Sequence, residues 1–157
     1  MPESDDERAF GEALDAALRQ VSLLVARDGE GARRVGRVLV RGGDPHWVER
    51  VAHAVADSPL VKTSLYGADP NWGRVAMAIG KCQDDRDIDP ERVVIRFGDL
   101  ETYPDRPDEK GLVRLAEIMA ADHVEIEIEL RTGSAESTVY GCDLSADYVR
   151  INADYTT

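Results

Sequence analysis

Residues 58–80 read Ser-Pro-Leu-Val-Lys-Thr-Ser-Leu-Tyr-Gly-Ala-Asp-Pro-Asn-Trp-Gly-Arg-Val-Ala-Met-Ala-Ile-Gly, and this stretch organises the fold around it. Ser58-Pro59 and Asp69-Pro70 each place a side-chain acceptor before a proline, which is typical of a helix start. Gly67 and Gly80 are residues of the kind that end helices. The stretch predicts a short helix, a bend at Gly67-Ala68, and a second, buried central helix that carries Trp72, Val75, Ala76 and Ile79.

The glycines of this stretch do not form a phosphate-binding loop. Such a loop has four residues between its first glycine and a Gly-Lys-Ser or Gly-Lys-Thr sequence. Six residues separate Gly73 from Gly80-Lys81, and Cys82 stands where the magnesium-binding hydroxyl belongs. The helical pattern between the glycines also uses its backbone N–H groups internally. A packing role for these glycines is therefore favoured.

Three blocks of the sequence resemble the ornithine acetyltransferases, also called bifunctional glutamate N-acetyltransferases. The first is the Ser-Pro-Leu-Val-Lys-Thr and Gly-Ala-Asp-Pro-Asn-Trp-Gly-Arg pair within residues 58–80. The others are Arg-Asp-Gly-Glu-Gly-Ala at 27–32 and Tyr-Val-Arg-Ile-Asn-Ala-Asp-Tyr-Thr-Thr at 148–157. Sequences at 80–85 and 139–144 further resemble a branch of the family found beside clavulanic acid biosynthesis. The resemblance implies a β-chain portion of such an enzyme, without its beginning.

Composition narrows the possible partners of this 157-residue chain. Its 19 Lys and Arg against 31 Asp and Glu give a net charge of −12, which disfavours nucleic acid and anionic membrane surfaces. No apolar run approaches the roughly 20 residues that span a bilayer, and no signal peptide is apparent. Cys82 and Cys142 are too few for a disulfide framework or a zinc site. We expect reduced thiols and a cytoplasmic protein.

The first segment is predicted to be a long helix that is capped by Asp5 or Asp6 and ended by Gly29. Its apolar residues recur at helical spacing. Glu30 follows between two glycines, where a carboxylate lies close to the backbone. Residue type alone favours a solvated turn residue. The apolar stripe consists of Phe10, Leu14, Ala17, Leu18, Val21, Leu24 and Val25.

A short apolar strand is predicted over residues 35–40, with a turn at Gly42-Gly43. A helix should follow from Asp44-Pro45. Glu49 and His53 lie one turn apart on this helix, but without a third nearby ligand they fit a solvated pair better than a metal site.

The pattern changes after the acidic segment 82–91, which we interpret as a surface loop and as the best internal boundary. Its spaced aspartates do not fit a calcium loop, because Pro90 replaces the bend glycine and Arg96 the final glutamate. Strands are predicted over residues 93–97, 100–103, 124–130, 137–142 and 148–155, with a helix around 112–119. The fold class is α+β (α/β), with a helix-rich segment at 1–81 packed on strands and a smaller α+β sheet domain at 82–157.

The resemblance also implies a mechanism. Family members cut themselves before a threonine, whose hydroxyl takes acetyl from N-acetylornithine and passes it to glutamate through an acyl-enzyme. The nucleophile opens the β chain of those enzymes. No threonine precedes Phe10 here, Ser4 lacks the matching context, and Thr63 falls inside a predicted helix. We therefore expect no catalytic nucleophile in this chain and no acetyl transfer by the chain alone.

The residues that match the family's substrate contacts are Glu30, Asn152 and Thr157. Glu30 would meet a substrate ammonium group, and Asn152, on the polar side of the last predicted strand, would hydrogen-bond a carboxylate or amide. The alternatives are a surface strand residue for Asn152 and a frayed terminus for Thr157. Asp69, Asn71 and Arg74 are weaker candidates, since helix capping explains Asp69 equally well.

Two function classes remain open. The first is the β-chain portion of a glutamate N-acetyltransferase of arginine biosynthesis, an acyltransferase that needs no cofactor or metal. Its partners would be the α chain of the same enzyme together with N-acetylornithine, ornithine and glutamate. The second is a standalone, non-catalytic ligand-binding or assembly domain derived from that family.

Overall fold

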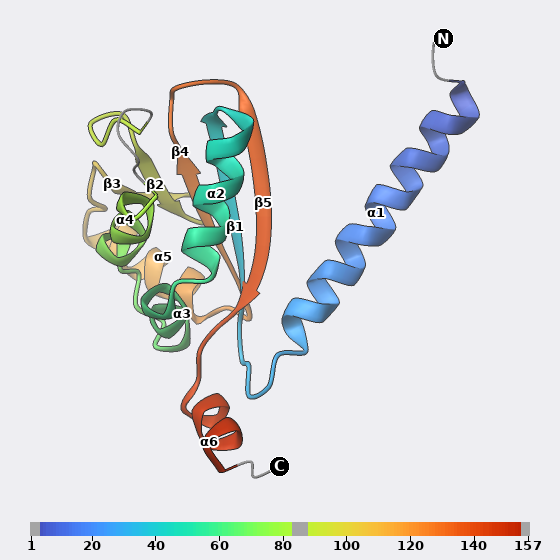
Figure 1. Cartoon of the computed structure of the whole chain (residues 1–157). Helices are drawn as coiled ribbons and strands as arrows, with labels where there is room; N and C mark the ends of the chain where they lie inside the picture. Colours follow the sequence, from blue (N-terminus) through green and yellow to red (C-terminus); the bar gives the residue numbers. More distant parts are fainter. Residues whose placement is uncertain (1–3, 83–87, 155–157) are drawn as a thin grey trace.

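The computed structural model describes residues 4–82 and 88–154, which form a single mixed sheet with four of their six helices packed on one face (Figure 1). The predicted α+β class is confirmed. The acidic loop predicted at 82–91 lies partly outside the described residues. The elements are α1 (Asp5–Arg27), β1 (Val35–Gly43), α2 (Pro45–Ala56), α3 (Pro59–Tyr66), α4 (Trp72–Gly80), β2 (Val94–Phe97), β3 (Leu100–Tyr103), α5 (Glu109–Ala120), β4 (His123–Glu129), β5 (Ala135–Cys142) and α6 (Ala146–Asp154).

The sheet has the strand order β3-β2-β4-β1-β5, so the first strand of the chain lies between two of the last. β1 runs parallel to β4, with Val38 opposite Ile126, and antiparallel to β5, with Val38 opposite Val139. β2 joins β4 and β3, both antiparallel. Both predicted segments, 1–81 and 82–157, therefore supply strands to one sheet. A boundary between residues 81 and 82 stays a prediction.

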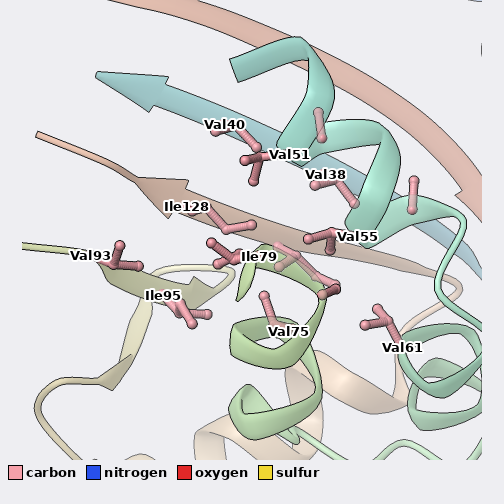
Figure 2. Close-up of a cluster of buried hydrophobic side chains, with 14 of the residues drawn as sticks. Val38, Val40, Val51, Val55, Val61, Val75, Ile79, Val93, Ile95 and Ile128 are labelled. Atoms are coloured by element: carbon pink, nitrogen blue, oxygen red, sulfur yellow. The ribbon is translucent and has the colours of Figure 1, made fainter. Parts of the chain in front are cut away.

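One face of the sheet carries the hydrophobic core, because alternate residues of each strand point to the same side. Val38, Val40, Ile95 and Ile128 belong to this face and are at most 2% exposed (Figure 2). Helices α2 to α5 cover them with apolar side chains from the same cluster. These include Val48, Val51, Val55, Val61, Leu65, Val75, Ile79, Leu115 and Met119.

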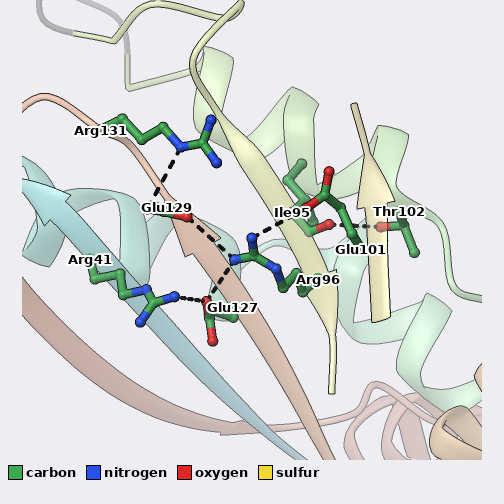
Figure 3. Close-up of polar contacts among 8 residues, drawn as sticks. All are labelled: Arg41, Ile95, Arg96, Glu101, Thr102, Glu127, Glu129 and Arg131. Atoms are coloured by element: carbon green, nitrogen blue, oxygen red, sulfur yellow. Dashed lines mark hydrogen bonds and ion pairs between the residues drawn. The ribbon is translucent and has the colours of Figure 1, made fainter. Parts of the chain in front are cut away.

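The other sheet face carries charges that pair across the strands (Figure 3). Arg96 of β2 lies 2.9 Å from Glu127, 3.4 Å from Glu129 and 3.2 Å from Glu101. Arg41 of β1 reaches Glu127 at 2.7 Å from the other side. Partial burial lowers the pKa of Arg96, but the hydrogen bonds and charges of the three glutamates raise it by more, so its net shift is upward. These pairs keep the half-buried charges compensated.

The stretch at 58–80 forms the two helices that its sequence predicts, with differences at their starts. Ser58 occupies the first N-cap but its hydroxyl makes no capping bond. The second helix is capped by Asn71, which accepts from the amide of Arg74 at 3.2 Å, and not by Asp69. Ala68, with φ of 52°, makes the predicted bend. This second helix, α4, is buried on one face only, and α2 occupies the centre over β1 and β5 (Figure 1).

The strand predicted over 148–155 is wrong, because α6 covers most of it. Val149, Ile151 and Ala153 alternate with polar residues as in a strand, yet none of the nine residues of α6 is buried. The hydroxyl of Ser145 accepts from the amide of Tyr148 at 3.0 Å, which supplies a helix start that the alternation concealed.

Candidate functional site

Residues 29–34, here called the Glu30 turn, connect α1 to the first strand. Gly31 has a φ of 66°, a backbone conformation that side chains disfavour. A Cβ at position 31 would lie 2.8 Å from the amide nitrogen of Tyr148 and 3.0 Å from the hydroxyl of Ser145. Only glycine therefore lets the turn approach the start of α6 this closely.

A buried carboxylate fixes the end of the Glu30 turn. One oxygen of Asp143 accepts from the amides of Arg33 at 2.8 Å and Arg34 at 3.2 Å. The amide of Asp143 also donates to the carbonyl of Arg34 at 3.0 Å. Asp143 is 3% exposed, so this oxygen depends on the N–H donors in place of water. The turn is thus fastened to the segment that leads into α6.

Two arginine side chains connect the Glu30 turn to the neighbouring helices α3 and α6. Arg34 donates to the carbonyls of Leu65 at 3.1 Å and Tyr66 at 2.7 Å, at the end of α3. Arg33 lies 5.3 Å from the centroid of the Tyr66 ring and pairs with Asp147 of α6 at 3.2 Å. The turn, α3 and α6 are therefore held in one arrangement.

This arrangement brings two of the predicted site residues together. The side-chain amide of Asn152 donates to a carboxylate oxygen of Glu30 at 2.9 Å and to the carbonyl of Tyr148 at 2.9 Å. Both side chains are exposed, which gives an open surface site. A carboxylate oriented in this way can pair with an ammonium group. Asn152 comes from helix α6 and not from the strand that the sequence predicted. Thr157, the third predicted residue, lies outside the described residues.

The weaker candidates form a separate cluster where α3 meets α4. Arg74 donates to the carbonyl of Leu60 at 2.9 Å and to the hydroxyl of Thr63 at 3.1 Å. The amide of Asn71 donates to Asp69 at 3.2 Å, and Arg74 lies 3.9 Å from the same carboxylate. These contacts join the two helices, as expected for packing and capping residues.

Within residues 4–82 and 88–154, no group of three His, Cys, Asp or Glu side chains is placed to hold a metal ion. The same residues include no helix with the length and apolar character needed to cross a bilayer.

Asp143, Arg33 and Arg34 all shape the site, but no sequence pattern predicts a role for them. Asp143 lies within the block 139–144, which resembles one branch of the family. The available signal for Asp143 was its position directly after the strand predicted over residues 137–142. Its burial depends on N–H donors 109 and 110 residues earlier, which a local pattern does not show.

Comparisons with known proteins agree with this arrangement of motifs. The ArgJ family model matches residues 2–157. "Arginine biosynthesis bifunctional protein ArgJ 2" of Nostoc sp. is 49% identical over 152 residues, or 96% of this chain and 39% of the relative. "Glutamate N-acetyltransferase Oat2" of Streptomyces clavuligerus is 49% identical over 97% of this chain and 40% of the relative. Since both relatives are equally similar, placement in the clavulanic-acid-associated branch stays a prediction.

A solved structure supports the fold as well. The crystal structure of "Arginine biosynthesis bifunctional protein argJ" from Bacillus halodurans matches with a TM-score of 0.89 and 37% identity. The match covers 99% of this chain and 73% of that chain. This chain spans about 40% of the length of the curated relatives described above. The resemblance seen in the sequence is confirmed, and the chain belongs to the ArgJ family.

Proposed function

We propose that this chain is the amino-acid-binding portion of a glutamate N-acetyltransferase and acts together with the portion of the enzyme that it does not span. The reaction would pass acetyl from the nitrogen of N-acetylornithine to a threonine hydroxyl, which releases ornithine. The acetyl group would then pass to the amino nitrogen of glutamate. The threonine belongs to the other portion. The names of the relatives, which include glutamate N-acetyltransferases, support this class of reaction.

The observation that carries the proposal is the 2.9 Å hydrogen bond between Asn152 and Glu30. These residues are 122 positions apart in sequence, and the tight turn at Gly31 brings them together. Glu30 would receive the substrate ammonium group, while Asn152 orients the carboxylate and contacts the substrate. Thr157 remains a proposed third contact. A cytoplasmic location is a further proposal, which the names of the relatives as biosynthetic enzymes support.

The test is reconstitution of the enzyme by co-expression of this chain with the unmatched portion of Oat2 from Streptomyces clavuligerus. We expect N-acetylglutamate to form from N-acetylornithine and glutamate. Glu30→Gln should raise KM about 10- to 100-fold, because a hydrogen bond to a charged group contributes about 1.5–3 kcal/mol. The matched control is Asp28→Asn, an exposed carboxylate two residues away, which should leave KM unchanged.

Two outcomes would argue against this proposal. A reconstituted Glu30→Gln enzyme with normal KM would remove Glu30 from the binding site. Acetyl transfer by this chain alone would contradict the proposal that the nucleophilic threonine belongs to the other portion.

The second candidate function is a standalone ligand-binding or assembly domain. One continuous core joins the sheet to α2 through α5, and this favours a unit that folds alone. Binding of glutamate or N-acetylornithine by the chain without any reconstituted activity would favour this candidate.

A further inference from the structure

We propose that the apolar side of α1 is the docking surface for the portion of the family protein that this chain does not span. This surface, here called the α1 face, consists of Phe10, Leu14, Leu18, Val21, Leu24 and Val25. This proposal rests on the proposed function in one respect, because it treats this chain as part of a larger enzyme.

The α1 face is exposed along the whole helix. Its six side chains are between 46% and 70% exposed, and none of the 23 residues of α1 is buried. Figure 1 shows α1 standing beside β5 and separating from the body toward the N-terminus. A cleft of about 570 Å³ lies between α1 and β5, lined by Leu18, Arg19, Arg37 and Tyr140 among others.

An exposed face of this kind indicates an interface. Helices in proteins gain most of their stability from burying an apolar stripe against other elements. A continuous row of large exposed apolar side chains marks an interaction site. The net charge of −12 disfavours an anionic membrane surface as the partner, and this favours another polypeptide. The core under α2 to α5 is closed without α1, so the rest of this chain does not need the α1 face.

The polypeptide that covers the α1 face can be inferred from how much of each relative aligns with this chain. The Bacillus halodurans structure aligns over 99% of this chain at a TM-score of 0.89, so the alignment takes in α1. About a quarter of that chain has no counterpart here, and about 60% of each curated relative has none. Additional polypeptide therefore accompanies a segment that aligns with α1 in the Bacillus halodurans structure, and we commit to the portion that this chain does not span as the occupant.

The test uses this chain co-expressed with the unmatched portion of Oat2 from Streptomyces clavuligerus. The test variant replaces Leu14, Leu18 and Leu24 with Gln, whose helix propensity is close to that of Leu. We expect the wild-type chain to co-purify with the Oat2 portion and the triple variant to bind at least about 100-fold more weakly, as for the loss of interface anchors.

The matched control combines Arg8→Gln and Glu12→Gln, which lie on the other side of α1 and leave the net charge unchanged. It should bind like the wild-type chain. Because α1 has no buried residue, thermal unfolding of the isolated chain should be the same for all three proteins. A loss of binding by the triple variant would then report on docking and not on folding.

The proposal is overturned if the triple variant binds the Oat2 portion as tightly as the wild-type chain, or if the wild-type chain does not bind it. It is also overturned if the α1 face mediates pairing with a second copy of this chain while Oat2 binding is unaffected. The experiment distinguishes a failure of the proposed docking surface from a failure of the proposed function. Co-purification without acetyl transfer contradicts the function, whereas equal acetyl transfer by the wild-type and triple-variant complexes contradicts the docking surface.

Discussion

Gly31→Ala should detach α6 from the Glu30 turn. The φ of 66° at residue 31 costs an alanine about 1–2 kcal/mol, because its Cβ approaches the following carbonyl. The added methyl group would also lie 2.8 Å from the amide nitrogen of Tyr148, and overpacking of this kind costs about 1–3 kcal/mol. Together these effects oppose the closed arrangement by about 2–5 kcal/mol.

The penalty should appear locally, because none of the residues of α6 is buried and the core does not depend on this helix. Hydrogen exchange at the Tyr148 amide, which donates to Ser145 at 3.0 Å, reports on the contact. A cost of about 2 kcal/mol corresponds to exchange faster by about thirtyfold. In the reconstituted enzyme the same change should raise KM, since Asn152 would no longer orient Glu30.

Gly11→Ala is the matched control, because it makes the same chemical change in the middle of α1. A Cβ at residue 11 would meet no atom within 4 Å, and alanine should favour the helix by about 0.5–1 kcal/mol. Exchange at Tyr148 should not change. If Gly31→Ala also left exchange at Tyr148 unchanged, the claim that close approach at this glycine positions α6 would be refuted.

The remaining predictions concern the sheet, the core and the helix start. Arg96→Met should lower the free energy of unfolding by about 1–3 kcal/mol in chemical denaturation, because half-buried glutamates lose their common partner. Arg114→Met, which breaks an exposed pair on α5, should change it by less than about 1 kcal/mol. Ile126→Ala should cost about 2–5 kcal/mol, since the side chain is fully buried. A side-chain NMR titration should place the pKa of Glu7 below its ordinary 4.5, because the backbone amide and then the hydroxyl of Ser4 donate to its carboxylate.

The sign of the Glu7 effect follows from the direction of its pKa. The folded value is lowered, so the capping contribution is complete above about pH 4.5 and is lost as the pH falls through the lower folded value. Ser4→Ala should return the pKa toward its ordinary value, and an unchanged titration would contradict the capping box. Equal effects of Arg96→Met and Arg114→Met would show that the charged sheet face contributes no more than an exposed ion pair.

Much of the fold could be predicted from local sequence patterns. Alternation at 93–97 and 124–130 identified strands because one face of the sheet is buried and the other charged. Asp44 before Pro45 marked the start of α2 correctly, since its side chain accepts from the amide of His46. Alternation failed at 148–155, because α6 has no buried face to impose a helical period on its apolar residues.

The site was predictable only in part. The Gly-Glu-Gly sequence and the family resemblance pointed to Glu30 and Asn152, and the structure places these side chains in contact. Their support from Asp143 and Arg34 depends on contacts between segments far apart in the chain. Such pairings follow from the strand order, which local periodicity does not determine.

The central position of β1 has a consequence for how the protein is made. β1 is synthesised before both of its neighbours in the sheet, β4 and β5, which end at Glu129 and Cys142. During translation both edges of β1 stay open until β4 and β5 have left the ribosome. Exposed strand edges invite intermolecular association, so the nascent chain is most vulnerable to aggregation in the interval before β5 emerges.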